Sequence, residues 1–363
     1  MPARIVVFGA TGYTGRLTAE AMVARGLRPV LPARNRERVE QLAAELGGLP
    51  TAVADVADPA SVGALVGRGD VLVSTVGPFS RWGEPAVRAA IDQGAHYLDS
   101  TGEPAFIRRV FDEFGAAPGS SALFTAFGYD FVPGNLAGGL ALREGGDAVR
   151  RIEVGYFVTG SSFGMSGGTR ASATDIFLNP AHSRRNGALH LERGGARVRS
   201  FEVAGKRRQA MSIGSSEAFA LPRLAPHLDA VDVYLGWFGP ATRVLQGLSA
   251  TLAGVSAIPG AQARLSGLLE RTVKGSSGGP DEQARARSMS LVVAEAFDGS
   301  GRRVSQVVLD GVNAYEFTGR ILAWGARQVA AGGVQRAGAL GPVDGFGLDA
   351  LQAGCAEAGI RVA

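Results

Sequence analysis

Residues 5–15 read IVVFGATGYTG, a short apolar run followed by three glycines spaced three residues apart. An apolar run that ends in glycine and then opens an amphipathic segment predicts a buried strand, a tight turn and a helix. In such a turn Gly9 permits the bend, Gly12 lets the backbone approach a pyrophosphate, and Gly15 allows close packing of helix on strand. The sequence therefore predicts a dinucleotide site, because a helix N-terminus offers unpaired N–H groups to phosphate. The contacts are expected from Gly9, Thr11, Gly12, Tyr13, Thr14 and Gly15.

Short apolar runs alternate with amphipathic segments from residue 4 to about residue 126, as a doubly wound parallel sheet requires. The predicted strands are 5–8, 29–33, 52–54, 71–75, 96–98 and 122–126. Helices are expected between them, for example over 15–25 and 36–46. The predicted fold class is α/β: an N-terminal Rossmann domain with a mostly parallel, doubly wound sheet, and a second, mixed α/β domain.

The length of 363 residues exceeds the size at which one hydrophobic core usually stops growing. We expect an NADP-binding Rossmann domain over 1–130 and a substrate and dimerisation domain over 131–331. The segment 332–363 is expected to pack back on the first domain. Within the second domain, two apolar runs at 290–297 and 304–309 flank the turn sequence DGSG, which predicts a pair of antiparallel strands.

The composition is that of a globular protein, with 46% hydrophobic and 19% charged residues. The basic clusters at 184–185 and 206–208 lack interleaved aromatic residues, so we expect no nucleic-acid partner. A single cysteine, Cys355, excludes an internal disulfide and favours a cytoplasmic location. The four histidines lie far apart without metal-ligand spacing, so no metal is expected.

The most apolar long stretch, 235–260, is interrupted by Pro240, Arg243, Gln246 and Pro259. It therefore fails the criterion of about 20 uninterrupted apolar residues for a membrane-spanning helix. Two interpretations stay open. We favour a helix pair in the core or in a homodimer contact over peripheral contact with lipid.

The choice between the two nicotinamide dinucleotides depends on the end of the second strand, where residues 31–36 read LPARNR. An acidic residue there would bind the ribose 2′-hydroxyl of NAD, whereas this chain supplies arginine. Because a guanidinium is a planar bidentate donor to phosphate, Arg34 is the expected contact of the 2′-phosphate and NADPH the expected cofactor. Asp55 and Val56 are placed to contact adenine. Beyond the fourth strand, the residues expected beside the ribose and pyrophosphate are Val76, Gly77 and Pro78.

The same glycine turn would suit a short-chain dehydrogenase, whose chemistry depends on the motif Tyr-x-x-x-Lys. The chain has only two lysines, Lys206 and Lys274, and neither follows a tyrosine at that spacing. This catalytic mechanism is therefore excluded.

Three further segments resemble the saccharopine dehydrogenase-like oxidoreductases. They are VGPF at 76–79 with GEP at 83–85, HYLDSTGE at 96–103, and GYDFVPGN at 128–135. SGGT at 166–169 and GPDE at 279–282 are similar to the same group in a looser way. The resemblance runs along nearly the whole chain. It implies a Rossmann domain, a second α/β domain that covers the nicotinamide, and NADPH-linked hydride transfer.

Members of that family include imine reductases and trans-acting enoyl reductases, and the apolar segment 235–260 resembles the enoyl reductase-like branch more. We therefore expect an NADPH-dependent reductase of a C=C or C=N bond in a small or acyl-type metabolite, with enoyl reduction favoured. The alternative is a non-catalytic NADP(H)-sensing protein whose second domain docks a partner, since fold alone does not determine function.

Proton donors for such a reduction are expected where the fifth and sixth strands end. The candidate catalytic residues are Tyr97, Asp99, Glu103 and Tyr129. A carboxylate at 99 or 103 suits pairing with a substrate cation in imine reduction, and the tyrosine at 129 suits donation to an enolate. Asp99 and Glu103 equally fit the capping of the next helix. The segment 129–130 equally fits closure of a domain hinge.

Substrate contacts are expected from Asp130 and from the glycine-rich loop 164–170. In this loop Ser166 and Thr169 offer hydroxyls, and Arg170 is suited to a carboxylate or phosphate. A helix cap at Ser166 is the structural alternative.

Overall fold

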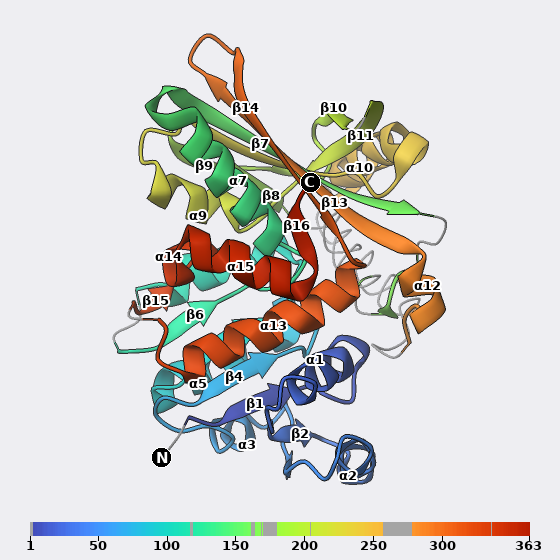
Figure 1. The fold of residues 1–363 in the computed structure, drawn as a ribbon, viewed down its shortest axis with the longest axis vertical. Helices are drawn as coiled ribbons and strands as arrows, with labels where there is room; N and C mark the ends of the chain where they lie inside the picture. The colour runs from blue at the N-terminus through green and yellow to red at the C-terminus, as the bar shows by residue number, and fades with distance from the viewer. Residues whose placement is uncertain are drawn as a thin grey trace.

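The computed structural model describes residues 3–116, 119–160, 164–167, 169, 180–203, 205–256, 278–334 and 336–363. Two β-sheets lie one above the other in Figure 1, with helices packed around the lower sheet and between the two. The chain builds the lower sheet first and the upper sheet second, and its C-terminal end returns between them.

The first sheet is parallel and has the strand order β1-β4-β5-β6-β15. Its strands are β1 (Ile5–Phe8), β4 (Val71–Ser74), β5 (His96–Asp99), β6 (Ala122–Phe124) and β15 (Gly338–Ala339). β2 (Leu31–Ala33) pairs with β3 (Thr51–Val53), and Val30 connects this pair to β1 through a parallel bridge to Val6. The resulting doubly wound arrangement confirms the predicted fold class and the six predicted strands.

Apolar residues at helical spacing explain the helices that cover this sheet. α1 (Tyr13–Val23) buries Gly15, Thr18, Ala19 and Met22 along one face. Asn35 caps the next helix by accepting a hydrogen bond from the backbone of Arg38. The remaining helices here are α2 (Arg36–Glu45), α3 (Pro59–Gly63), α4 (Phe79–Trp82), α5 (Glu84–Gln93) and α6 (Pro104–Arg109).

The second sheet is mixed and has the order β10-β11-β12-β7-β13-β14-β16, with β8 and β9 attached at β12. β13 (Ser288–Asp298) and β14 (Arg303–Gly311) are antiparallel, which confirms the predicted pair. α7 (Val132–Gly145) packs on β7, β13 and β14. The other strands are β7 (Val149–Gly160), β8 (Pro180–Arg185), β9 (Ala188–Arg193), β10 (Val198–Val203), β11 (Lys206–Ile213), β12 (Ala230–Leu235) and β16 (Ile360–Val362). The other helices that precede β13 are α9 (Glu217–Leu224), α10 (Thr242–Ser256) and α12 (Glu282–Ala286).

The last part of the chain ties the two sheets together. α13 (Ala314–Ala330) packs along α1, and β15 extends the first sheet, whereas β16 pairs with β14 of the second. α14 (Pro342–Phe346) and α15 (Leu348–Ala358) lie between them against α7 (Figure 1). Phe346 stacks on Phe124 of β6 with ring centroids 4.8 Å apart. Aromatic burial of this kind stabilises the junction by roughly 1.5–3 kcal/mol for each fully buried side chain.

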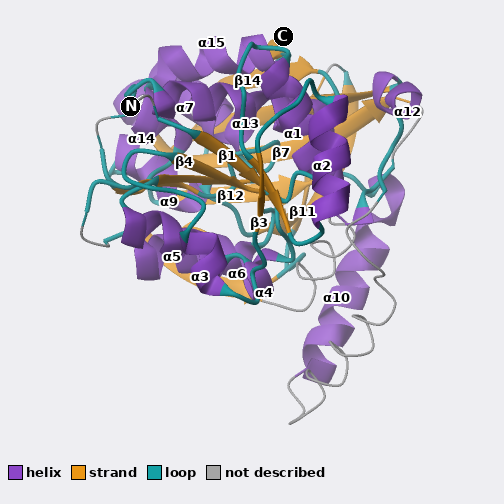
Figure 2. Cartoon of the chain, turned by 90° about the horizontal axis from the view of Figure 1, so that it is seen from below, coloured by secondary structure: helices purple, strands orange, loops and turns teal. Residues whose placement is uncertain are grey.

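α10 projects from the body of the molecule in Figure 2 and carries the described part of the apolar segment. Val244 and Leu248, one helical turn apart, are 74% and 51% exposed. None of the described helices has both the length and the apolar content that a membrane crossing requires.

The contact of α1 with α13 depends on the absence of a side chain at Gly319. A Cβ there would lie 2.9 Å from the backbone carbonyl of Leu17. We predict that Gly319→Ala lowers the free energy of unfolding by about 1–3 kcal/mol, because the helices must move apart. The matched control is Gly247→Ala on α10, where a Cβ meets nothing within 4 Å. This control is expected to be neutral or slightly stabilising, since alanine favours helix. Urea denaturation of both variants checks this, and equal effects would contradict it.

Candidate functional site

The glycine turn has the geometry that a dinucleotide requires. Gly9 has a φ of +91°, and the N–H of Gly12 donates to its carbonyl oxygen at 2.9 Å. A Cβ on Gly15 would lie 2.2 Å from that same oxygen, so helix and strand approach as closely as only glycine allows. Thr75, just beyond β4, donates its hydroxyl to the carbonyl of Phe8 at 3.1 Å. The turn is therefore held between β1, α1 and the end of β4.

This turn fits a bound pyrophosphate. No side chain caps the N-terminus of α1, which leaves the first-turn N–H groups for a ligand. Among the described residues, the one atom that a Cβ on Gly12 would meet within 4 Å is the Gly9 carbonyl oxygen, at 3.2 Å. Arg34 is exposed directly after β2, beside the N-terminus of α2. Asp55 and Val56 follow β3, and Val76 to Pro78 follow β4, so the predicted nucleotide contacts all lie beyond the carboxyl ends of strands.

Glu103 is buried, and its carboxylate accepts hydrogen bonds from backbone N–H groups. Its Oε1 accepts the N–H of Phe79 and its Oε2 the N–H of Ser80, both at 2.8 Å. The hydroxyl of Ser80 also donates to Oε2. Glu103 thus caps α4, a helix that begins 24 residues earlier in the chain, and these bonds account for its burial.

Asp99 performs a similar task at the end of β5. Its Oδ1 accepts the N–H groups of Thr101 at 2.9 Å and Ala126 at 2.8 Å, which joins the ends of β5 and β6. Burial raises the pKa of Asp99 to about 6, although these hydrogen bonds oppose the shift. The neighbouring Tyr97 is buried in the core, where burial and the Asp99 carboxylate hold its pKa well above the usual range.

Tyr129 is also buried, and its hydroxyl is hydrogen-bonded to a strand of the second sheet. The hydroxyl donates to the backbone oxygen of Phe157 in β7 at 3.0 Å, and the backbone N–H of Tyr129 donates to the hydroxyl oxygen of Thr318 in α13 at 3.0 Å. Burial raises its pKa far above the usual range. These two bonds connect the loop after β6 to β7 of the second sheet and to α13.

Asp130 lies in the loop between β6 and α7, at the same edge of the sheet. A Cβ on Gly102 would lie 2.9 Å from its Oδ2, so the carboxyl group rests on the loop after β5. Its Oδ1 is buried without a hydrogen-bond partner among the described residues. Burial raises its pKa to about 7, with no opposing cation. The raised pKa makes Asp130 a candidate proton donor.

Glu217 is a functional candidate that the sequence analysis missed. It is fully buried at the start of α9, and its Oε1 accepts the hydroxyl of Tyr156 at 2.7 Å. Burial raises its pKa to about 8. An acidic residue in the first turn of a helix is usually exposed, so its position gave no sign of this environment.

The glycine-rich loop touches the nucleotide turn through two tyrosines. Tyr315 accepts the N–H of Ser166 at 2.8 Å and lies 2.7 Å from the hydroxyl of Thr169. Its ring meets that of Tyr13 edge to face at 5.1 Å. Tyr13 in turn donates its hydroxyl to the carbonyl of Pro280 at 2.5 Å. The predicted substrate loop is thus coupled to the predicted cofactor turn, while Arg170 lies outside the described residues.

Ser166 also accepts the backbone N–H of Thr169 at 3.1 Å, which is the geometry of a local cap. No group of histidine, cysteine, aspartate and glutamate in the described part of the chain is arranged to hold a metal ion.

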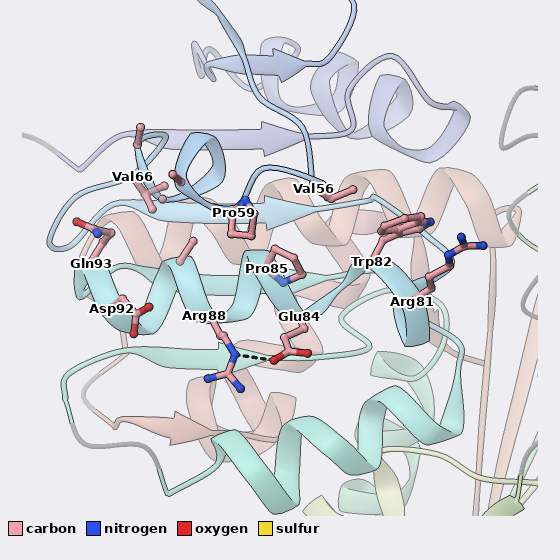
Figure 3. Close-up of a pocket in the computed structure, with 14 residues that line it drawn as sticks. Val56, Pro59, Val66, Arg81, Trp82, Glu84, Pro85, Arg88, Asp92 and Gln93 are labelled. Atoms are coloured by element: carbon pink, nitrogen blue, oxygen red, sulfur yellow. Dashed lines mark hydrogen bonds and ion pairs between the residues drawn. The ribbon is translucent and has the colours of Figure 1, made fainter.

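A cavity of about 880 Å³ lies between α3 and α5 (Figure 3). Val56, Trp82 and Arg81 lie toward one end of it, and the guanidinium of Arg81 stacks over the Trp82 ring at 4.6 Å. Val56 is the only predicted nucleotide contact among its lining residues, so the cavity adjoins the expected adenine position and is separate from the glycine turn.

The comparisons with known proteins agree with this geometry. Residues 5–114 match the family model described as the saccharopine dehydrogenase NADP binding domain. This match confirms the family resemblance of the N-terminal part and identifies NADP(H) as its cofactor.

Two mycobacterial relatives are similar to part of the chain. A Mycobacterium tuberculosis protein named "Putative trans-acting enoyl reductase" is 37% identical over 183 residues, which cover 47% of this chain and 43% of that protein. A "Trans-acting enoyl reductase" of Mycobacterium leprae is 39% identical over 140 residues, or 36% of this chain and 34% of that protein. The matched part spans less than half the length of either relative.

One solved structure has a similar fold over nearly its whole length. Apo saccharopine dehydrogenase (L-Glu forming) from Saccharomyces cerevisiae superposes with a TM-score of 0.59, covering 97% of this chain and 96% of that one. At 12% identity, this likeness shows the shared fold alone.

The position of Arg34 leads to a prediction about cofactor choice. Arg34→Asp should raise the Kd for NADPH by about ten- to a hundredfold, because a charged hydrogen bond to the 2′-phosphate is lost. The Kd for NADH should change much less. Calorimetric titration with both nucleotides measures this, with Arg243→Asp on exposed α10 as the charge-matched control. An equal loss for both nucleotides would refute the role.

The buried carboxyl groups lead to a second prediction. The pKa values of Asp99, Asp130 and Glu217 are about 6, 7 and 8, above their ordinary 3.8 and 4.5, so the folded state retains protons that the unfolded chain releases. Their contribution to stability is therefore lost as pH rises through the folded pKa values. His182 acts in the opposite direction but only below its ordinary value of 6.5, because burial lowers its pKa to about 4.

The free energy of unfolding should hence fall between about pH 6.5 and pH 8, by at most ~1.4 kcal/mol per pH unit for each group. Glu217→Gln should make this decline shallower. Urea denaturation across that range tests it, and an identical pH slope in the variant would disprove the assignment.

Proposed function

We propose, from the match of residues 5–114 to the saccharopine dehydrogenase NADP-binding domain, that the protein is an NADPH-dependent reductase. Its favoured reaction is reduction of the C=C bond of an enoyl substrate. The observation that carries the proposal is the Asp130 carboxyl group, which rests on Gly102 with one buried oxygen unpartnered. It lies beyond the carboxyl ends of β5 and β6, at the edge where open α/β sheets bind their ligands.

Bound NADPH supplies the hydride, so the protein must bind the nucleotide, orient the substrate and provide a proton. The uncapped N-terminus of α1 and the glycine turn suit the pyrophosphate, and Arg34 suits the 2′-phosphate. Tyr13 and Tyr315 connect this turn to the loop of Ser166 and Thr169. This connection supports a substrate position that the second domain covers.

Asp130 is the group that we assign to proton delivery. Asp99 and Glu103 already accept two and three hydrogen bonds, and the Tyr129 hydroxyl donates to Phe157. Burial raises the pKa of Asp130 to about 7, near the value at which a general acid works best. For Asp99 and Glu103 we therefore prefer helix capping to catalysis, and for Tyr129 we prefer closure of the domain hinge.

One comparison and one chemical argument favour an enoyl substrate over an imine. The mycobacterial relatives bear the name trans-acting enoyl reductase. Reduction of an enoyl C=C bond leaves an enolate that needs one proton, and Asp130 is suited to give it. An imine substrate would instead engage a carboxylate as a counter-ion, and the hydrogen-bonded carboxylates of Asp99 and Glu103 face the backbone.

The experiment is to follow NADPH consumption with 2-enoyl thioesters of several chain lengths and, in parallel, with imines and simple carbonyl compounds. The proposal expects turnover with the enoyl thioesters. Tight NADPH binding with no turnover across the whole panel would favour a nucleotide-sensing protein and overturn the enzymatic assignment.

The division of roles between Asp130 and Tyr129 gives a further prediction. Asp130→Asn should lower kcat by about 10²- to 10⁴-fold with little change in NADPH affinity, because only the proton donor is lost. Tyr129→Phe should keep kcat within a few-fold and lower the free energy of unfolding by about 1 kcal/mol, the worth of one hydrogen bond. The reverse pattern of kcat values would assign proton delivery to Tyr129 instead.

A further inference from the structure

Tyr13 belongs to the nucleotide turn through its backbone and contacts a distant segment through its side chain. It follows Gly12 as the first residue of α1, whose N-terminus no side chain of the described residues caps. Its hydroxyl donates to the backbone oxygen of Pro280 at 2.5 Å. Pro280 lies in residues 278–286, here called the α12 segment, which leads into β13 of the second sheet. One side chain therefore joins the expected pyrophosphate position to this segment.

The backbone of the α12 segment packs on the ring of Tyr13. A Cβ on Gly279 would lie 2.7 Å from three ring carbons of Tyr13, so only glycine allows this approach. The ring of Tyr315, in the first turn of α13, meets the Tyr13 ring edge to face with centroids 5.1 Å apart. The Tyr13 ring is thus in contact with both the α12 segment and α13.

Arg285 joins the same three elements by hydrogen bonds. Its Nη1 donates to the hydroxyl oxygen of Tyr13 at 3.2 Å and to the carbonyl oxygen of Pro280 at 3.0 Å. Its Nε donates to Oε1 of Glu316 in α13 at 3.3 Å. The side chain of Arg285 is only 14% exposed. Because a guanidinium holds its donors in a fixed plane, Arg285 sets the positions of α1, the α12 segment and α13 relative to one another.

The predicted substrate loop is bonded to both neighbours of Tyr13. The hydroxyl of Tyr315 accepts the N–H of Ser166 at 2.8 Å and lies 2.7 Å from the hydroxyl of Thr169. The N–H of Gly167 donates to the carbonyl oxygen of Gly278 in the α12 segment at 3.2 Å. The place of this loop therefore depends on the two elements that the Tyr13 side chain contacts.

This set of contacts can open without unfolding either sheet. Tyr13, Tyr315 and Thr169 are half-buried, and their contacts are mainly hydrogen bonds and one aromatic pair. Segments held by few buried apolar contacts open locally at a low cost in free energy. A ligand that fixes one end of such a link reduces the entropy that a second ligand must lose at the other end.

We propose that Tyr13 and Arg285 are positioning residues that couple the bound nucleotide to the substrate loop. A pyrophosphate at the N-terminus of α1 fixes the backbone of Tyr13, and the Tyr13 ring then holds the α12 segment and Tyr315 in place. The loop of Ser166 and Thr169 is ordered for substrate as a result. Coupling between sites is reciprocal, so substrate in the loop tightens the binding of the nucleotide. The substrate half of this inference rests on the proposed reductase function.

The first test needs no substrate. Hydrogen–deuterium exchange of the full protein, with and without saturating NADPH, should show slower exchange of residues 278–286 when NADPH is bound. This protection should be lost in Tyr13→Ala and in Arg285→Gln, while residues 9–12 remain protected by NADPH. Arg285 lies outside the nucleotide turn, so its variant tests the link even where Tyr13→Ala weakens NADPH binding.

The control is Arg16→Gln, on the same helix, because the Arg16 guanidinium pairs with Glu20 and Glu45 and not with the α12 segment. This variant should show the wild-type protection. Absence of protection at 278–286 in the NADPH-bound wild-type protein would overturn the coupling. Undiminished protection in Arg285→Gln would overturn it as well.

The second test is steady-state kinetics with an enoyl thioester at saturating NADPH. Tyr13→Phe keeps the ring and removes the hydroxyl, and should raise the KM for the thioester by about 3- to 10-fold, the worth of one hydrogen bond. Arg285→Gln should do the same, with kcat within a few-fold of the wild-type value in both variants. A purely structural role would lower the free energy of unfolding and leave this KM unchanged.

The outcomes separate this inference from the proposed function. If the wild-type protein oxidises NADPH with an enoyl thioester but exchange and KM are unchanged in the variants, the coupling is disproved and the reductase stands. If exchange behaves as expected but no enoyl substrate is reduced, the link from the nucleotide turn to the α12 segment stands and the proposed reaction is disproved.

Discussion

Buried carboxylates that accept backbone N–H groups hold the carboxyl edge of the first sheet together. Asp99 joins the ends of β5 and β6, and Glu103 joins the start of α6 to the start of α4. Loops that leave a parallel sheet at one edge carry many unpaired N–H groups, and these acids satisfy them. The loop of Tyr129 begins directly after Ala126, whose N–H Asp99 accepts.

Hydrogen bonding to the backbone also indicates which buried acids hold the fold together and which are candidates for proton transfer. A carboxylate that accepts two backbone N–H groups is stabilised in its ionised form and is a weak proton donor. Oδ1 of Asp130 and Oε2 of Glu217 have no hydrogen-bond partner among the described residues, which is also true of Oδ2 of Asp99. Burial raises the pKa of Asp130 to about 7 and that of Glu217 to about 8. The proposed proton donor is Asp130, whose Oδ1 accepts no hydrogen bond from the described residues.

The sequence predicted what is local. The β1 strand, the glycine turn and α1 are specified within residues 5–23, and Arg34 follows its strand directly. It did not predict that Glu103 caps a helix 24 residues away, or that Tyr13 contacts Pro280. Glu217 depends on a notch at Gly134, 83 residues earlier, and the strands β15 and β16 join different sheets. Such contacts depend on tertiary packing, and no periodicity in one sequence records them.

The central claim is that the glycine turn and Arg34 form a site for NADPH. Calorimetric titration of the unmodified protein with NADPH and NADH, side by side at one ionic strength, tests it most directly. The account predicts saturable binding at one site per chain, with NADPH bound at least about tenfold more tightly because the 2′-phosphate adds a charged contact. Binding of neither nucleotide, or equal affinity for both, would contradict it.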